Sequence, residues 1–161
     1  GPVITKKHQE RVIGYIDQGE AEGADVALDG RHVNVAGYDG YFVGPTVLDG
    51  VTPDMTVAKE EIFGPVASFF SMKDLDEAIA WINHSPYGNA ASIYTSSGKA
   101  ARDFRYRVRA GSIGINLGIA AAMAYFPFGG MKNSFFGDLH PQGRDAIRFF
   151  TESKVVITRW V

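Results

Sequence analysis

The strongest constraint on the fold is an alternation of strand-like and helix-like segments between Val66 and Asn116. Short apolar stretches have the length and residue types of strands, and the stretches between them carry apolar residues at helical spacing. The predicted strands are 66–72, 91–95 and 112–116. Two helices are predicted between them, one that begins after Asp74 and one that covers 98–109. A β-α-β-α-β order favours an α/β sheet with crossover helices. We therefore predict an α/β fold.

The residues ahead of this alternation are predicted to form one helix and several short strands. Thr5 is a suitable N-cap, and Val12, Ile13 and Ile16 fall on one face of a helix that runs to about Glu20. Beyond it we predict a strand at 26–28, a turn at 29–30, a short returning strand over 33–35 and an extended stretch 41–48 that contains Pro45.

The end of the chain lacks this regularity. Leu117–Phe128 is apolar but has neither helix nor strand periodicity, and such a loop usually lines a cavity or an interface. We predict a short helix over 143–150 and a last apolar strand over 154–161. An exposed apolar strand promotes aggregation, so we expect this one to pair with a sheet of a second subunit. The predicted division is a domain of residues 1–150 and a terminal oligomerisation strand, 151–161.

Composition excludes several classes of function. The net charge of −2 provides no basic field for nucleic acid or an anionic membrane, and no apolar run approaches the ~20 residues of a membrane span. The absence of cysteine excludes disulfides and thiolate zinc sites. The histidines show no metal-binding spacing, so no metal site is predicted; they are His8, His32, His84 and His140.

Two adjacent carboxylates, Glu60 and Glu61, precede the predicted strand at 66–72. Neighbouring side chains of an extended segment point to opposite faces, so one carboxylate can face a cleft while the other faces water. A carboxylate accepts hydrogen bonds from both hydroxyls of a sugar diol. Phe63, two residues after Glu61, would share its face, and its ring is suited to support a flat ligand. The residues alone leave open a simpler interpretation, a solvated pair of glutamates before a buried strand.

The segment around these carboxylates resembles one found in a known enzyme family. Residues 59–66, Lys-Glu-Glu-Ile-Phe-Gly-Pro-Val, are similar to the segment with which aldehyde dehydrogenases hold the nicotinamide ribose of NAD. The resemblance extends in order over essentially the whole chain, through residues 1–4, 42–46, 74–79, 86–89 and 114–116. It implies that NAD is the cofactor, that Glu61 holds the ribose, and that Phe63 packs near the nicotinamide.

A narrower resemblance is to the branch of this family that acts on methylmalonate and malonate semialdehydes and releases an acyl-CoA. It rests on residues 123–128, 134–140 and 149–156. The chain departs from that branch at Gly129, where Ser is typical, at Met131, where Trp is typical, and at Ala90-Ala91, which replace a Gly-Thr pair. The resemblance implies coenzyme A as co-substrate and a small semialdehyde as substrate.

The same resemblance places Phe128 and the apolar loop before it in the wall of the substrate channel. The residues assigned to that channel are Phe128, Tyr125, Met123 and Asn116. Phe128 is equally consistent with a core aromatic after a proline turn. Asn116 ends a predicted strand, where its side chain can instead hydrogen-bond locally.

The family attacks aldehydes with a cysteine thiolate, and this chain has no cysteine. We therefore expect a carboxy-terminal piece of a longer enzyme, inactive alone, whose partners are the missing amino-terminal portion and other copies in a homo-oligomer. The expected location is the cytoplasm, or the mitochondrial matrix in a eukaryote. Two alternatives stay open, an aldehyde dehydrogenase that releases free acid by hydrolysis, and a non-catalytic structural or interaction module.

Overall fold

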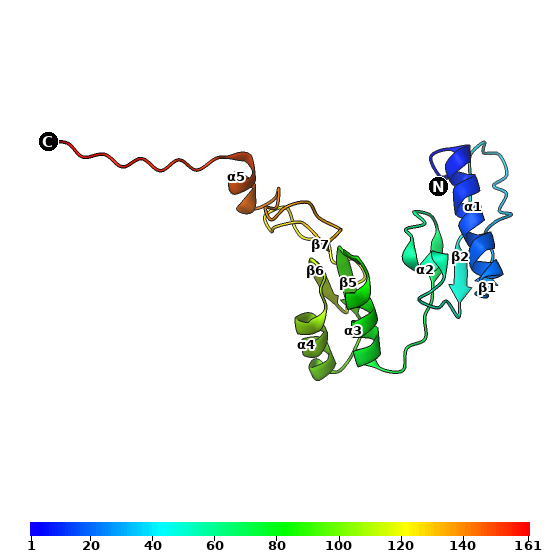
Figure 1. The fold of residues 1–161 in the computed structure, drawn as a ribbon. Coiled ribbons are helices and arrows are strands. Elements are labelled where there is room, and N and C mark those ends of the chain that lie inside the picture. The colour runs from blue at the N-terminus through cyan, green and yellow to red at the C-terminus, as the bar shows by residue number, and fades with distance from the viewer. The chain divides into compact units, whose positions relative to one another are not determined.

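A computed structural model describes all residues from Gly1 to Val161. The chain forms two compact units, Gly1–Met72 and Lys73–Val161 (Figure 1). The sequence contains no linker-like stretch near Met72, and this boundary was not predicted. The predicted division at residue 150 concerns a different feature, the terminal strand, and stays a prediction.

The first unit packs two helices with a three-stranded sheet. Its elements are α1 (Lys6–Ala21), β1 (Asp25–Leu28), β2 (Thr46–Asp49), α2 (Thr56–Lys59) and β3 (Val66–Ser68). The central strand β2 runs antiparallel to β1 and parallel to β3. Thr5 caps α1 as predicted, because its hydroxyl accepts a hydrogen bond of 3.1 Å from the His8 backbone N–H.

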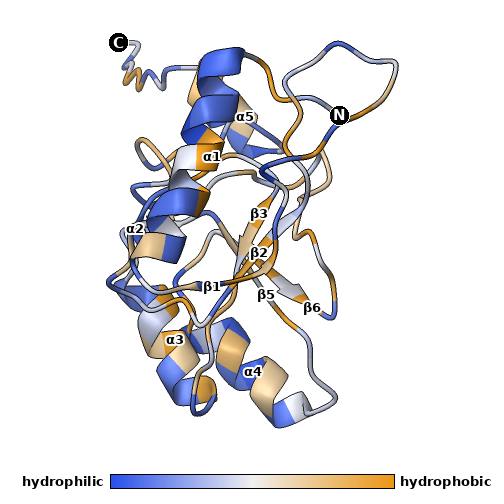
Figure 2. Ribbon diagram, turned by 90° about the vertical axis from the view of Figure 1, so that its right-hand side faces the viewer, coloured by the Kyte–Doolittle hydropathy of each residue, from blue (hydrophilic) through white to orange (hydrophobic).

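The core of the first unit lies between α1 and β2. Val12, Ile16 and Leu48 are fully buried, and they pack with Val57 of α2. The helix α1 is otherwise mainly hydrophilic, as its blue and white segments in Figure 2 show. Its apolar residues therefore form the narrow buried face that the sequence predicted.

Two strand predictions in this unit need correction. No strand forms over 33–35, and β1 pairs instead with β2, which lies about 20 residues further along the chain. The predicted strand at 66–72 ends at Ser68 and is only half buried, because β3 has a single neighbour, β2, and forms an edge of the sheet. The turn expected at Asp29 and Gly30 lies two residues later, at 31–32, and leads into a loop.

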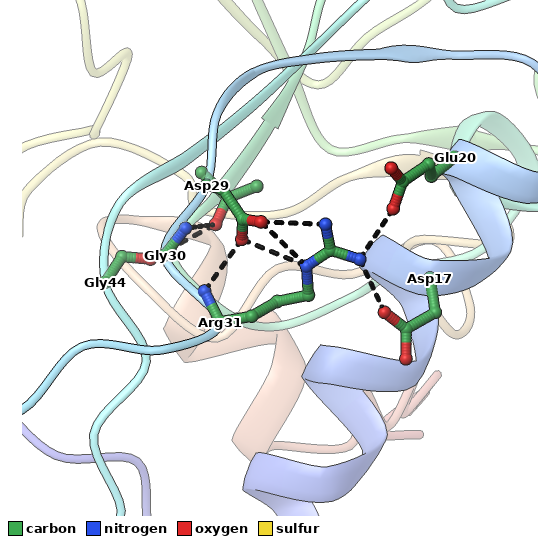
Figure 3. A network of polar contacts seen from close by, with 7 residues as sticks. Asp17, Glu20, Asp29, Gly30, Arg31 and Gly44 are labelled. Carbon is green, nitrogen blue, oxygen red and sulfur yellow. Dashed lines mark hydrogen bonds and ion pairs between the residues drawn. The ribbon is translucent and has the colours of Figure 1, made fainter.

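A polar network holds that loop (Figure 3). Arg31 donates to Asp29, Asp17 and Glu20, with nitrogen–oxygen distances of 2.6–3.0 Å. The last two acceptors lie on α1, so the guanidinium joins the loop to that helix. Gly30 accepts a hydrogen bond of 2.9 Å from the Gly44 backbone N–H. These contacts hold the start of the loop against α1 and Gly44.

This network predicts a change of stability in acid. The Arg31 guanidinium, with a second hydrogen bond from its backbone N–H, lowers the pKa of Asp29 from 3.8 to about 2. A carboxylate with a depressed folded-state pKa stabilises the fold above its unfolded pKa, and that contribution is lost as the pH falls toward the folded pKa. We expect Asp29→Asn to flatten the loss of stability between about pH 4 and pH 2, measured by urea unfolding. Asp39→Asn, in an exposed loop, is the control and should leave the slope unchanged; equal slopes for both variants would contradict the assignment.

The second unit contains the predicted alternation from its first helix onward, whereas the first predicted strand of that alternation, β3, belongs to the sheet of the first unit and does not pair with the two later strands. Its elements are α3 (Leu75–His84), β4 (Tyr87–Gly88), β5 (Ala90–Ile93), α4 (Gly98–Arg107), β6 (Ser112–Ile115), β7 (Met131–Lys132) and α5 (Asp145–Phe150). The strands β5 and β6 are parallel and α4 connects them, which confirms the α/β crossover. The helices α3 and α4 carry alternating hydrophobic and hydrophilic residues (Figure 2). Their inner residues form a second core, Ile79, Phe104, Val108 and Ala110.

The short sheet of β4 and β7 was not predicted. Its strands are two residues each and antiparallel. Lys132 explains why they meet, because its ammonium donates to the backbone carbonyls of Ile82, Asn83, Ser85 and Tyr87 at 2.9–3.3 Å. These include the last carbonyls of α3, which lack partners within the helix. Burial lowers the pKa of this lysine.

Residues 151–161 form no strand within the chain. They continue beyond α5 as an extended, exposed segment, drawn in red at the end of the ribbon in Figure 1. Val155, Ile157 and Trp160 are almost completely exposed. Pairing of this segment with another subunit stays a prediction. None of the helices combines the length and apolar character needed to cross a bilayer.

Candidate functional site

Residues 60–65 form an irregular segment between α2 and β3, and their two carboxylates have different surroundings. Glu60 accepts a hydrogen bond of 2.6 Å from the hydroxyl of Tyr15, which in turn accepts one of 3.1 Å from Arg11. Both partners belong to α1. Glu60 is therefore held against the helix, at the start of the segment.

The Glu61 carboxylate is exposed and makes neither a hydrogen bond nor an ion pair. The next residue, Ile62, is buried in the core of the first unit and fixes the backbone beneath it. The hydrogen bond with Tyr15 and the nearby Glu60 and Glu61 carboxylates raise the pKa of Arg11. Glu61 is thus an available acceptor on an anchored backbone.

Phe63 is 77% exposed and has a φ of 54°, in the left-handed region. The strand-like alternation that placed Phe63 on the same face as Glu61 therefore ends before Phe63. A left-handed conformation is costly for a residue with a side chain and is found preferentially at functional sites. The ring is presented to solvent on a tight turn rather than packed into the core.

Gly64 brings this turn close to α1. A Cβ at Gly64 would lie 2.8 Å from the Cγ atoms of Val12, which is fully buried. Only glycine permits that approach without moving the core. The residue that Gly64 approaches so closely therefore belongs to the core face of α1.

The second unit contains an open hollow of about 430 Å³ at the β5–β6 sheet. Its lining combines small residues with one aromatic side chain; the residues are Asn89, Ala90, Ala91, Ser92, Ser112, Gly118, Ile119, Ala120, Ala121 and Phe128. Phe128 therefore lines this hollow and is 44% exposed, and its place in a substrate channel stays a prediction. The small loop residues opposite it leave room for a ligand with an apolar part.

The other residues assigned to the channel do not line this hollow. Tyr125 and Met123 are exposed and contact each other, with 2.8 Å between the hydroxyl and the sulfur. The Asn116 side chain bonds the backbone of Thr95, accepting from its N–H at 2.8 Å and donating to its carbonyl at 3.1 Å. The local use of this amide was the alternative left open by the sequence. The substrate role of these three residues stays a prediction.

An aromatic stack packs against the residue after Phe128. The rings of Phe135 and His140 are stacked with centroids 4.7 Å apart, and His140 lies 3.6 Å from a carboxylate oxygen of Asp145. A side chain at Gly129 would overlap the His140 ring. The absence of a side chain at Gly129, noted as unusual in the sequence, allows this stack to sit directly behind Phe128.

One further residue, His8, contacts the Glu61 segment and was not predicted to do so. His8 of α1 places its Nε2 atom 2.8 Å from the carbonyl oxygen of Phe63. The only sign in the sequence that His8 has a fixed place is its position three residues after the capping Thr5. No group of three or more His, Cys, Asp or Glu side chains is arranged to hold a metal ion.

Comparison with known proteins assigns these features to one family. Residues 1–156 match the sequence profile of the aldehyde dehydrogenase family. The chain is 52% identical over 159 residues to malonate-semialdehyde dehydrogenase 1 of Geobacillus kaustophilus and 51% identical over 160 residues to malonate-semialdehyde dehydrogenase of Halalkalibacterium halodurans. Each match covers 99% of this chain and 33% of the relative. The chain thus spans about a third of the length of these relatives.

The solved structures that resemble this chain belong to the same family. A putative methylmalonate-semialdehyde dehydrogenase from Sinorhizobium meliloti, complexed with NAD, superposes with a TM-score of 0.96 at 44% identity, over 100% of this chain and 33% of that one. An aldehyde dehydrogenase of Mycobacterium tuberculosis, complexed with NAD+, gives a TM-score of 0.84 at 38% identity over 94% of this chain and 30% of that one. The predicted α/β fold and the predicted resemblance to the semialdehyde branch are confirmed.

Proposed function

This chain belongs to the aldehyde dehydrogenase family, and from that premise we propose that it is the cofactor- and substrate-facing third of an NAD-dependent, CoA-acylating semialdehyde dehydrogenase. The proposed reaction converts methylmalonate or malonate semialdehyde into an acyl-CoA. Two relatives that share about half of their matched residues with this chain are named malonate-semialdehyde dehydrogenases, which supports this substrate class. The NAD complex of the Sinorhizobium meliloti protein supports the cofactor.

The observation that carries the proposal is the free carboxylate of Glu61, followed two residues later by the exposed ring of Phe63. A carboxylate without a partner inside the fold is available to accept from both hydroxyls of a ribose, and such charged hydrogen bonds contribute about 1.5–3 kcal/mol each. An exposed aromatic ring next to it is suited to pack against a flat nicotinamide. These two side chains fit the nicotinamide half of NAD, which when bound supplies the acceptor for a hydride.

The rest of the chain's contribution is to bind and to exclude water. We assign the hollow beside Phe128 to the substrate, with the small residues Gly118, Ala120 and Ala121 giving it width and Phe128 forming an apolar wall. An apolar wall displaces water from the reacting aldehyde and favours transfer of the acyl group to a thiol over hydrolysis. The nucleophilic thiol comes from polypeptide outside this chain, which contains no cysteine.

The second candidate is a hydrolytic aldehyde dehydrogenase that releases a free acid. Its support is that the chain also matches proteins named only as aldehyde dehydrogenases, such as the Mycobacterium tuberculosis protein at 38% identity. Product analysis of the full-length enzyme with and without coenzyme A separates the two. We expect acyl-CoA to be the main product when coenzyme A is present, and turnover to free acid at the same rate regardless of coenzyme A would defeat the proposal.

Activity of the isolated chain provides a further test. We expect residues 1–161 alone to oxidise no semialdehyde above background, because the family's thiolate nucleophile is missing. The measurement is NADH formation by absorbance, with the full-length enzyme as positive control. Turnover by the isolated chain that survives repurification would show that its chemistry differs from that of the family.

A further inference from the structure

Three residues other than glycine have a left-handed backbone, and two of them stabilise it with their own side chains. They are Phe63, Asn116 and Lys132, with φ values of 54°, 54° and 58°. Asn116 bonds the backbone of Thr95 twice, and Lys132 binds four carbonyl groups. Phe63 has no polar side chain, so its conformation must be held by a neighbour.

His8 is the neighbour in position to do this. Its Nε2 atom lies 2.8 Å from the Phe63 carbonyl oxygen, and since a carbonyl only accepts, Nε2 carries the proton and donates. The two rings meet edge to face with centroids 6.4 Å apart. His8 is itself fixed in the first turn of α1, where its backbone N–H donates to the Thr5 hydroxyl.

The other end of the segment is held by the same helix. Tyr15 donates to Glu60, and His8 donates to Phe63, so α1 fixes both flanks of the free Glu61 carboxylate. The two anchors lie two helical turns apart on α1 and leave Glu61 without a partner of its own. This arrangement sets the backbone between the anchors before any ligand arrives.

We propose that His8 is a positioning residue of the nicotinamide site, acting by holding Phe63 in the left-handed conformation that presents its ring. This inference rests on the proposed function for its ligand. Its structural half, that His8 sets the backbone of Phe63, does not depend on that function. Without His8, the turn at Phe63 relaxes toward extended backbone, and only the fraction of molecules in the left-handed state binds the cofactor well.

The test uses the full-length enzyme and NAD, with affinity measured by calorimetry and turnover measured at saturating NAD. We expect His8→Ala to raise the Kd for NAD about tenfold, equivalent to ~1.4 kcal/mol, while kcat changes by less than about twofold. His8→Gln, whose amide nitrogen can still donate, should restore the Kd to within about twofold of the wild type. Thermal unfolding of each variant checks that the fold is kept.

Gln9→Ala is the matched control. Gln9 is the next residue of the same helix and also donates to a backbone carbonyl, that of Phe42 at 2.7 Å, which is not part of the Glu61 segment. This variant should leave the Kd for NAD unchanged within error. An increase equal to that of His8→Ala would mean that any lost contact of α1 has the same effect, and would overturn the proposal.

A double-mutant cycle separates positioning from direct contact with the cofactor. If His8 acts through Phe63, then His8→Ala added to Phe63→Ala causes little further loss of affinity. Fully additive losses would mean that His8 contacts NAD itself. A crystal structure of His8→Ala supplies the remaining readout, because a φ at Phe63 that stays near 54° refutes the positioning role even if NAD binding is altered. If the wild type does not bind NAD, the proposed function is wrong. The φ of Phe63 in His8→Ala then still decides whether His8 sets the backbone of Phe63.

Discussion

Glu61→Ala in the full-length enzyme is expected to raise the Kd for NAD by about 30- to 150-fold. The variant removes the acceptor that we assign to two ribose hydroxyls. Each such bond contributes about 1.5–3 kcal/mol, and because water can bind the freed hydroxyls we expect a net loss of about 2–3 kcal/mol for the pair. Nothing inside the chain compensates, because the Glu61 carboxylate has no hydrogen bond or ion pair of its own. For the same reason the stability of the protein should stay within ~0.5 kcal/mol of the wild type, as for other surface substitutions.

Glu60→Gln is the matched control, since the two carboxylates are adjacent and differ only in their surroundings. Tyr15 can still donate to the remaining amide oxygen, so the segment should keep its anchor. We expect the Kd for NAD to change by less than about threefold. Calorimetric titration measures both variants, and a larger loss for Glu60→Gln than for Glu61→Ala would reverse the assignment of the two carboxylates.

Gly30→Ala is expected to have the largest effect on stability, about 3–5 kcal/mol. A Cβ at Gly30 would overlap the carbonyl oxygen of Gly44, and backbone atoms cannot rotate away as a side chain does. The close approach is maintained by hydrogen bonds on both sides, from Gly44 to Gly30 at 2.9 Å and from the Gly30 N–H to the buried Thr46 hydroxyl at 3.0 Å. The variant must therefore shift the loop or break these bonds, and urea unfolding should show a lower midpoint.

Gly14→Ala provides the opposite expectation with the same chemical change. Gly14 lies inside α1, and a Cβ there would have no atom within 4 Å. Alanine in place of glycine should stabilise the helix by about 0.5–1 kcal/mol. If both substitutions shift the urea midpoint in the same direction, the contact between Gly30 and Gly44 does not have the structural role described.

The local parts of the fold could be predicted because single residues specify them. Thr5 and Asp74 cap helices where the sequence indicated, and each accepts the expected hydrogen bond from a backbone N–H three residues later. The helices and strands of the second unit follow from apolar spacing, since α3 and α4 expose one face and bury the other. The parallel pairing of β5 and β6 then follows from the helix that connects them.

Pairing between distant segments could not be predicted in the same way. The returning strand expected over 33–35 is absent because Arg31 and Gly30 are engaged with α1 and with Gly44, contacts that no local pattern reveals. The β4–β7 sheet depends on Lys132 reaching carbonyl groups about 45–50 residues away. Such interactions are decided by tertiary packing, which overrides local preference.

The candidate site shows the same division. The resemblance alone pointed to Glu61 and Phe63. The structure adds a physical difference between the two neighbouring glutamates, because Tyr15 holds Glu60 by a hydrogen bond and Glu61 has no such partner. The left-handed backbone of Phe63 and its hydrogen bond from His8 have no signature in the sequence, because phenylalanine does not favour that conformation. Phe128 lines a hollow, whereas Tyr125 and Met123 are exposed, and the place of all three in a substrate channel stays a prediction.

A crystal structure of the full-length enzyme with NAD is the most direct test of the role of Glu61. We expect each of the two hydroxyls of the nicotinamide ribose to lie within about 2.5–3.0 Å of a Glu61 carboxylate oxygen. The two hydroxyls can bind different oxygens or share one. A complex in which other groups bind those hydroxyls, while Glu61 forms an ion pair with the rest of the enzyme, would contradict it.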